Sequence, residues 1–182
     1  MKTNTMQWPD RMNPTDALFW SMDKIPEMRS TIGALIILER APSRERIREA
    51  FERISYELVR MRQRVVDIPF ALAPPEWVTD PQFDLDYHLR TVAIPQPGGM
   101  DELLAEISPL YATALDRERP LWEAYLAEGL MGDRGAIFVK MHHCLTDGVG
   151  GARLSESLLR ERPDSDDDAP RRVAEPRSTT SA

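Results

Sequence analysis

The stretch Gly135-Ala-Ile-Phe-Val-Lys-Met-His-His-Cys-Leu-Thr-Asp-Gly-Val-Gly150 joins an apolar run to two histidines, an aspartate and a glycine-rich turn. Residues 135–141 are rich in β-branched and aromatic types, which predicts a short buried or half-buried strand. If the strand continues through both histidines, side-chain alternation places His143 on the face of Val139 and His142 on the opposite face. We then expect the two imidazoles to point in opposite directions.

A single imidazole at the end of a strand suits proton transfer. An ordinary histidine, with a pKa of about 6.5, keeps a neutral nitrogen that can accept a proton near neutral pH. His143 is therefore the candidate general base. A zinc site is disfavoured, because adjacent strand residues cannot both aim at one ion and the sequence offers only His88 and Cys144 to complete a shell. The alternative is a solvated histidine pair at a strand end.

The residues around the histidines have more than one interpretation. The glycines within 148–151 disfavour a helix and favour a tight turn after Asp147. Asp147 either holds the imidazole directly, as in a catalytic triad, or pairs with an arginine and locks the loop that carries the histidine. Cys144 raises the alternative of a Cys-His nucleophile. Because adjacent strand positions diverge, we expect Cys144 instead to be a small buried apolar residue.

The pattern His142-His143-x-x-x-Asp147-Gly148 resembles the active-site motif of the CoA-dependent acyltransferase superfamily, which includes chloramphenicol acetyltransferases and the condensation domains of peptide synthetases. A more specific likeness comes from Pro120-Leu121-Trp122-Glu123, whose spacing from the histidines is similar to that of the bacterial wax ester synthase/diacylglycerol acyltransferase family. The resemblance covers residues 11 to about 160. Further matching segments lie at 13–19, 83–90, 95–98, 115–117 and 128–130.

The resemblance implies an α/β fold, namely half of a chloramphenicol acetyltransferase-like domain with a mixed sheet flanked by helices. It also implies that His143 deprotonates an acceptor hydroxyl for direct attack on an acyl-CoA thioester, without a covalent acyl-enzyme. Asp147 is then chiefly structural, and Gly148 keeps the turn tight. Acyl-CoA is implied as a co-substrate, with no bound cofactor and no metal; the likeness identifies no CoA-contacting residue.

Pro120, Leu121 and Trp122 belong, by the same resemblance, to a motif whose role is less settled than that of the histidines. For Trp122 two interpretations have equal weight: an aromatic side chain of the core and a position in the substrate channel. The motif also argues against a condensation domain, which is the alternative enzyme class.

The composition is typical of a cytosolic globular protein, with 42% hydrophobic residues, a net charge of −7 and a pI near 5.1. The acidic balance and the lack of a basic stripe argue against a nucleic-acid partner. One cysteine allows no intrachain disulfide. The longest aliphatic run, 32–38, is shorter than the roughly 18 residues of a spanning helix, and the N-terminus lacks the apolar core of a signal peptide. We therefore expect a cytoplasmic protein with at most peripheral contact with a membrane or lipid droplet.

Hydrophobic periodicity predicts alternating helices and strands along the rest of the chain. The best-defined apolar face lies on a helix that Ser43 caps, and its members are Ile47, Ala50, Phe51, Ile54, Leu58 and Met61. The lone His88 is expected to be a hydrogen-bonded structural residue. The predicted elements are a central strand over 31–39, a helix over 44–62, one or two short strands within 70–94, a helix over 101–115 that Pro109 kinks or splits, a hairpin of strands over 122–130 and 136–143, and a short helix over 152–160.

Residues 1–162 are expected to form the domain, and residues 163–182, acidic and almost without apolar side chains, a disordered tail. The 182 residues make one domain, whereas members of the resembled family carry a second, similarly built half. Three interpretations follow: half of an enzyme completed by a separate polypeptide, a half that closes its site as a homodimer, or a non-catalytic remnant that binds lipid or a partner. The intact motif favours an acyltransferase, or a subunit of one, that acts on diacylglycerol or a long-chain alcohol.

Overall fold

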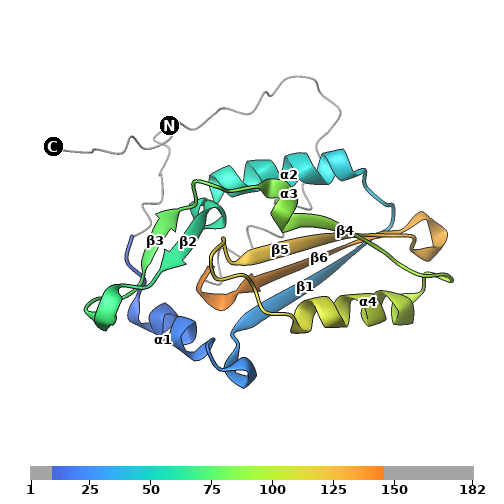
Figure 1. Ribbon diagram of the computed structural model, residues 1–182. Coiled ribbons are helices and arrows are strands. Elements are labelled where there is room, and N and C mark those ends of the chain that lie inside the picture. The colour runs from blue at the N-terminus through green and yellow to red at the C-terminus, as the bar shows by residue number, and fades with distance from the viewer. Residues whose placement is uncertain (1–9, 146–182) are drawn as a thin grey trace.

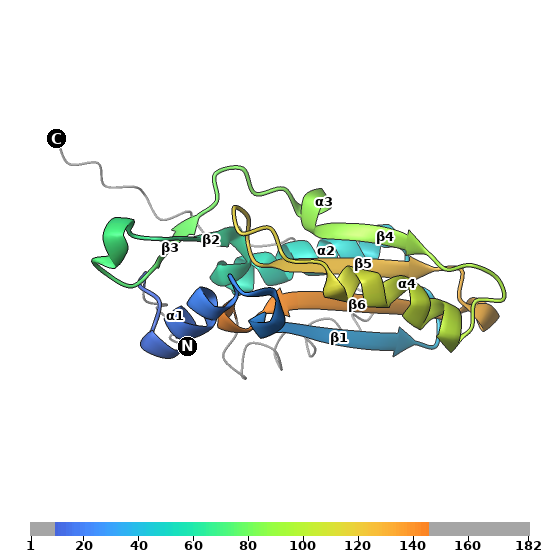
Figure 2. The same cartoon turned by 60° about the horizontal axis from the view of Figure 1, so that its bottom comes forward.

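The computed structural model of the chain describes residues 10–145, and its centre is a mixed four-stranded sheet (Figure 1). The strands lie side by side in the order β1 (Thr31–Leu38), β6 (Gly135–His142), β5 (Trp122–Glu128) and β4 (Leu89–Ala93) (Figure 2). β6 runs antiparallel to both β1 and β5, while β4 runs parallel to β5. The mixed sheet flanked by helices that the family resemblance implies is therefore confirmed.

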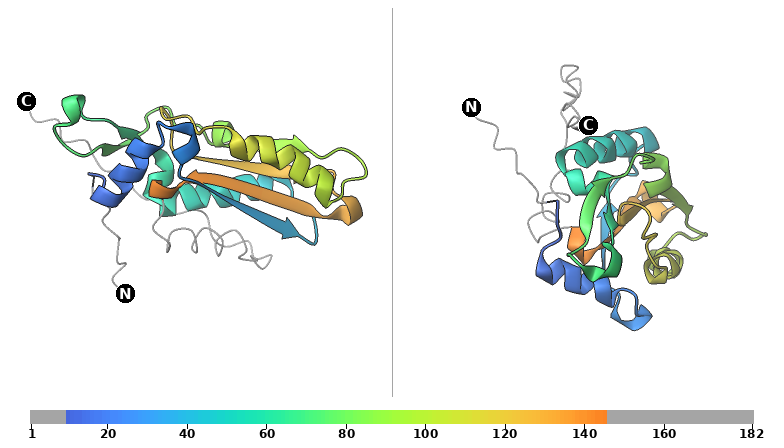
Figure 3. Two further views of the ribbon diagram at one scale, coloured as in Figure 1. Left: turned by 90° about the horizontal axis from the view of Figure 1, so that it is seen from below. Right: turned by 60° about the vertical axis from the view of Figure 1, so that its left-hand side comes forward.

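Two helices cover opposite faces of this sheet. α2 (Arg44–Glu57) lies across one face and α4 (Met100–Ala112) across the other (Figures 1 and 3). Alternate residues of β6 point to the two sides: Val139 packs in the core beneath α2 and Phe138 in the core beneath α4. All eight residues of β6 are buried as a result, which explains why its sequence reads as a nearly continuous apolar run.

A smaller unit lies at one end of the sheet. It contains α1 (Pro14–Met22) and the antiparallel pair β2 (Gln63–Val66) and β3 (Glu76–Thr79), which form a sheet of their own (Figure 3). A one-turn helix, α3 (Leu85–His88), leads into β4. Short 3-10 turns occupy Pro26–Met28, Val59–Arg62, Pro69–Ala71, Met131–Asp133 and His143–Leu145.

Several predicted elements are present and others differ. The hairpin of β5 and β6 is confirmed, and Ser43 caps α2 as expected, because its hydroxyl accepts a hydrogen bond from the Arg46 N–H at 3.2 Å. α2 is shorter than predicted, since it ends at Glu57 and a 3-10 turn continues to Arg62. The expectation that 31–39 is a central strand is wrong: among the described residues β1 pairs with β6 alone and forms an edge of the sheet.

The second predicted helix is not split by its proline. Pro109 lies in the last turn of α4, where it removes only one backbone donor before the helix ends at Ala112. The sequence did not predict α1, α3 or β2. Asp147, Gly148, the helix expected over 152–160 and the tail from 163 lie outside the described residues.

Candidate active site

The two histidines of the motif lie at the point where β6 ends. His142 is the last residue of the strand and is buried, whereas His143 begins a 3-10 turn and is exposed. The expectation that the strand runs through both residues is therefore wrong, and the alternation rule does not extend to His143. Both rings contact α1, His142 edge-on to Trp20 and His143 against Phe19.

His143 is held by its backbone and by one aromatic contact. Its N–H donates to the carbonyl of Ser30 at 2.7 Å, which continues the β1–β6 ladder past the end of the strand. Its ring lies 4.6 Å from the ring of Phe19, centroid to centroid, at an interplanar angle of 37°. The imidazole is thus packed on one side and open on the other, so a reactant can approach it from outside.

His142 is built into the protein interior and stays neutral. Its Nδ1 accepts a hydrogen bond from the backbone N–H of Cys144 at 3.1 Å, which places the ring proton of the neutral form on Nε2. Nε2 faces Oδ1 of Asp23 at 3.4 Å, longer than a good hydrogen bond. Burial lowers the pKa of His142, and the positive charge of Arg117 lowers it further, against the opposing effect of Asp23.

Cys144 is a buried thiol, as expected. It does not, however, point away from the neighbouring histidine, as the alternation of strand residues predicts. Because the chain turns after His142, the sulfur lies 2.9 Å from His142 Nδ1 instead of diverging from it. Burial raises the pKa of the Cys144 thiol, and the negative charges of Asp16 and Asp23 raise it further. The thiol therefore stays protonated, which disfavours a Cys-His nucleophile.

The Pro120-Leu121-Trp122 motif lies directly beside the histidines. The carbonyl of Leu121 accepts the backbone N–H of His142 at 2.9 Å. Trp122 is fully buried, and its ring lies between Phe51 at 5.6 Å and His88 at 4.7 Å, centroid to centroid, nearly parallel to both. Its indole N–H donates to the carbonyl of Met61 at 2.8 Å. In the described part of the chain Trp122 is thus an aromatic residue of the core that ties β5 to α2 and to the turn after it.

His88 supports the same tryptophan and is structural, as expected. Its Nδ1 is hydrogen bonded to the carbonyl of Trp122 at 2.7 Å, and its ring also stacks on Phe83. Burial lowers the pKa of His88, so this histidine is neutral within the core.

A buried charge cluster, which sequence reasoning did not identify, crosses β5, β6 and β4. The Lys140 ammonium, which is fully buried, lies 2.9 Å from Glu123 Oε2 and donates to two carbonyl oxygens at the C-terminal end of α4, at 2.9 and 3.1 Å. Glu123 also meets Arg90 at 3.1 Å and accepts the hydroxyl of Tyr125 at 2.7 Å. The signal in the sequence was a lysine inside an apolar strand. In the sheet this lysine pairs directly with the glutamate of Pro-Leu-Trp-Glu.

Within residues 10–145, no three histidine, cysteine, aspartate or glutamate side chains gather in a way that could bind a metal ion. No helix in this part of the chain is both long enough and apolar enough to cross a bilayer. The described residues place one exposed imidazole, His143, next to a buried neutral one, His142, and an exposed imidazole is a group that can transfer a proton.

Comparison with known proteins relates this arrangement to one family. The model of the wax ester synthase/diacylglycerol acyltransferase catalytic domain matches residues 12–182. A putative diacylglycerol O-acyltransferase of Mycobacterium tuberculosis is 39% identical over 145 residues, which are 80% of this chain and 30% of that protein. A probable diacylglycerol O-acyltransferase of the same organism is 41% identical over 131 residues, 71% of this chain and 28% of that protein.

Solved structures show the same fold. The wax ester synthase/diacylglycerol acyltransferase from Marinobacter aquaeolei VT8 matches with a TM-score of 0.66 and 34% identity, over 85% of this chain and 39% of that one. The starter condensation domain of rhizomide synthetase matches with the same TM-score of 0.66 at 13% identity, over 81% of this chain and 35% of that one, which is a likeness of fold alone. The chain spans about a third of the length of the relatives it matches.

Proposed function

Because the chain belongs to the wax ester synthase/diacylglycerol acyltransferase family, we propose that it is an O-acyltransferase, or part of one, that uses acyl-CoA as donor. The proposed acceptor is the hydroxyl of diacylglycerol, for which relatives are named, or of a long-chain alcohol, whose acylation gives the wax ester of the family's name. The observation that carries the proposal is the position of His143: exposed, at the end of a fully buried strand, and beside the Pro-Leu-Trp motif.

In the proposed reaction His143 acts as general base. It takes the proton of the acceptor hydroxyl as the oxygen attacks the thioester carbonyl, and a tetrahedral oxyanion forms. The oxyanion collapses, the carbon–sulfur bond breaks, and the proton on the imidazolium passes to the CoA sulfur that leaves. His142 and Asp147 are proposed to support the base rather than to exchange protons with substrate. Gly148 is proposed to keep the turn tight.

The test is replacement of the two histidines one at a time. His143→Ala should lower acyl transfer from acyl-CoA to diacylglycerol or hexadecanol by about 10² to 10⁴, the usual contribution of a general base. His142→Ala is the matched control on the neighbouring residue and should retain more activity. Near-normal turnover in His143→Ala would rule out this histidine as the base.

The proposal includes a partner that completes the site, because His143 is exposed at the end of β6. The partner is either a separate polypeptide that corresponds to the second half of those relatives or a second copy of this chain. A closed site excludes water and places donors against the oxyanion, and we propose that the partner contributes to both.

We also propose peripheral contact with a lipid surface through the turn that joins β2 to β3. This turn projects at one end of the molecule (Figure 1) and belongs to a run of eight uncharged residues, 68–75. Its side chains Phe70 and Leu72 are 93% and 81% exposed, and such apolar exposure is typical of an interaction site.

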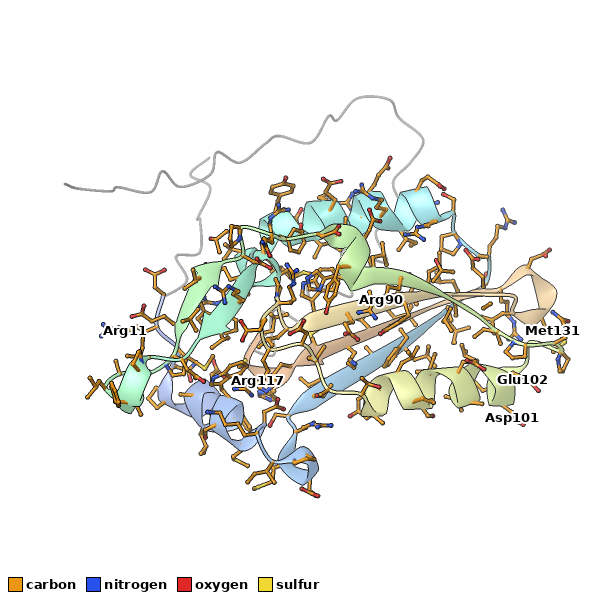
Figure 4. All side chains as sticks on the ribbon, viewed as in Figure 1. Arg11, Arg90, Asp101, Glu102, Arg117 and Met131 are labelled. Atoms are coloured by element: carbon orange, nitrogen blue, oxygen red, sulfur yellow. The ribbon has the colours of Figure 1, made fainter. Side chains whose placement is uncertain are left out.

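The contact can be measured by co-sedimentation with vesicles of phosphatidylcholine and diacylglycerol. Replacing Phe70 and Leu72 by Ser should lower partitioning at least about ten-fold, since burying each side chain in lipid is worth about 1.5–3 kcal/mol. Met131→Ser is the control, because Met131 is 54% exposed but lies at the opposite end of the sheet (Figure 4). Equal partitioning of the wild type and the Phe70/Leu72 variant would rule out this turn as the contact.

A further inference from the structure

We propose that Asp23 is a positioning residue for His143, a role that rests on the proposed function of His143 as the base. Its carboxylate holds the connection between α1 and β1 against the end of β6, and that connection fixes the backbone from which the imidazole projects. The motif that identifies the family does not include this residue.

Asp23 reaches the candidate base through one intermediate residue. Its Oδ1 accepts the backbone N–H of Ser30 at 3.2 Å, and the carbonyl of Ser30 accepts the N–H of His143 at 2.7 Å. Ser30 precedes β1 directly, so these two bonds clamp the turn after β6 to the segment that enters β1. A displacement of Ser30 therefore moves the backbone of His143 with it.

The carboxylate is itself held from three sides. Its second oxygen lies 3.4 Å from Nη1 of Arg117, and the side chain is only 11% exposed. The guanidinium of Arg117 lies over the ring of Trp20, 3.2 Å from its centroid, and donates to the Trp20 carbonyl at 3.2 Å; Figure 4 shows Arg117 beside α1. On the third side, Asp23 Oδ1 faces the buried ring of His142 at 3.4 Å. Asp23 is thus fixed by Arg117 at one oxygen and by Ser30 and His142 at the other.

The same helix also packs on the imidazole. Asp23 is the C-cap of α1, and its backbone N–H donates to the carbonyl of Phe19 at 3.0 Å. Phe19 in turn contacts the ring of His143. One helix end therefore sets both the ring and the backbone of the candidate base, and Asp23 is the residue that joins this helix end to Ser30.

The first measurement is amide hydrogen exchange on the 182-residue chain, which does not depend on turnover. Asp23→Ala should speed exchange of the His143 amide at least about ten-fold, while the amides of β5 and central β6 keep the wild-type rates. Asp23→Asn retains an oxygen for the Ser30 N–H and should restore most of the protection. Asp67→Ala is the control, because Asp67 binds the same helix through Trp20 Nε1 at 2.7 Å without contact to Ser30.

The second measurement is kinetic and uses the assembly that transfers acyl groups. Asp23→Ala should lower kcat about 10- to 100-fold, because a small misplacement of a catalytic group costs this much, with KM for acyl-CoA within about two-fold. In a His143→Ala background the same substitution should change the residual rate less than about two-fold, since the residue it positions is gone. Asp23→Asn should recover most of kcat.

Two results would overturn the proposal. One is an unchanged rate of exchange at His143 in Asp23→Ala, or faster exchange spread evenly over the sheet, which would make Asp23 a general stabilising residue. The other is an equal loss of kcat with and without His143. If no assembly transfers acyl groups, the proposed function fails, and the exchange data still decide whether Asp23 positions His143.

Discussion

Glu123 brings a negative charge into the sheet, and its surroundings keep it ionised. Burial alone would raise the pKa of this carboxyl, but hydrogen bonds from Lys140 and Tyr125 and the charges of Lys140 and Arg90 outweigh it and hold the pKa below its ordinary value. The lysine needs this partner equally, because its ammonium is fully buried. Glu123, which follows the Pro-Leu-Trp motif of the family likeness, is thus half of a buried ion pair in this fold.

Replacement of Glu123 by Gln should lower the free energy of unfolding by about 3 kcal/mol at pH 7, since it leaves the Lys140 charge buried without its counter-ion. The folded pKa of Glu123 lies below its unfolded value. Its contribution is therefore present above about pH 4.5 and is lost as the pH falls through the folded pKa. The difference in the free energy of unfolding between the wild type and the variant should then become smaller as the pH is lowered.

Urea unfolding at pH 7 and at pH 3.5 measures this effect. Glu118→Gln is the control, because Glu118 also faces an arginine, Arg64 at 3.5 Å, but its side chain is 85% exposed and should contribute little. An equal destabilisation by both substitutions, or a Glu123 effect that does not change with pH, would contradict the prediction.

At the scale of elements, two glycines bring the loop after β4 against the loop after β5, at the end of the sheet far from the histidines. Gly98 has φ +77°, and a Cβ added there would lie 2.3 Å from the carbonyl oxygen of Gly129. Gly129 has φ +92°, and its own Cβ would lie 2.9 Å from the carbonyl oxygen of Ile94. The Pro-Gln-Pro-Gly and Glu-Gly-Leu segments of the family likeness are therefore explained here by close backbone packing.

Gly98→Ala should destabilise the protein much more than Gly132→Ala. Both positions have positive φ, which costs an alanine about 1–2 kcal/mol, but a Cβ at Gly132 (φ +75°) meets nothing within 4 Å. At Gly98 the backbone atoms that the methyl would strike cannot move aside, which adds roughly 1–3 kcal/mol. Chemical unfolding of the two variants checks this, and equal losses would show that φ alone governs both sites.

Sequence periodicity predicted the elements that are stabilised by contacts between residues close in sequence. The α2 stripe that contains Phe51 and the Ser43 cap follow from spacing within one helix, and the β5–β6 hairpin follows from two strands with a short loop between them. The order of strands in the sheet could not be predicted from the sequence. The pattern of 31–39 is apolar enough for a central strand, and strand pairing depends on partners distant in sequence.

The sequence likewise predicted some features of the candidate site and not others. His143 could be identified from its motif, and the structural role of His88 from its isolation in the sequence. The direction of the His143 ring could not be predicted, because it depends on where the strand stops, and that is set by contacts with α1 and Ser30. The link from Asp23 could not be predicted either, since Asp23 and Ser30 lie 119 and 112 positions before His142 in the chain and are joined to its neighbour only by hydrogen bonds to the backbone.

At the scale of the whole molecule, the sheet is well covered in its middle and less so at the end that carries His143. β5 and β6 are buried by α2 and α4, whereas α1 and the connection to β1 present Leu18, Ile25 and Met28 with 57%, 48% and 44% exposure. These three side chains lie on α1 and on the segment that follows it, the part of the chain that contacts His143 through Phe19 and Ser30, and exposed apolar surface beside a site can serve as an interface. The partner that closes the proposed site is therefore expected to bind here.

The 182-residue chain on its own should self-associate through this surface and transfer acyl groups poorly, because an open site admits water, and each oxyanion donor that a partner contributes is worth roughly 2.7 to 4 kcal/mol. Replacement of Leu18, Ile25 and Met28 by Ser should shift light scattering towards the monomer. The control replaces Met100 and Leu104, which are 47% and 45% exposed on α4, and should leave association unchanged.

Addition of the complementary half of a relative should raise acyl transfer by the wild type and less by the triple variant. A monodisperse, fully active wild-type monomer would show that the site is closed without any partner, whereas a failure of every complementary half to raise activity would favour a non-catalytic chain.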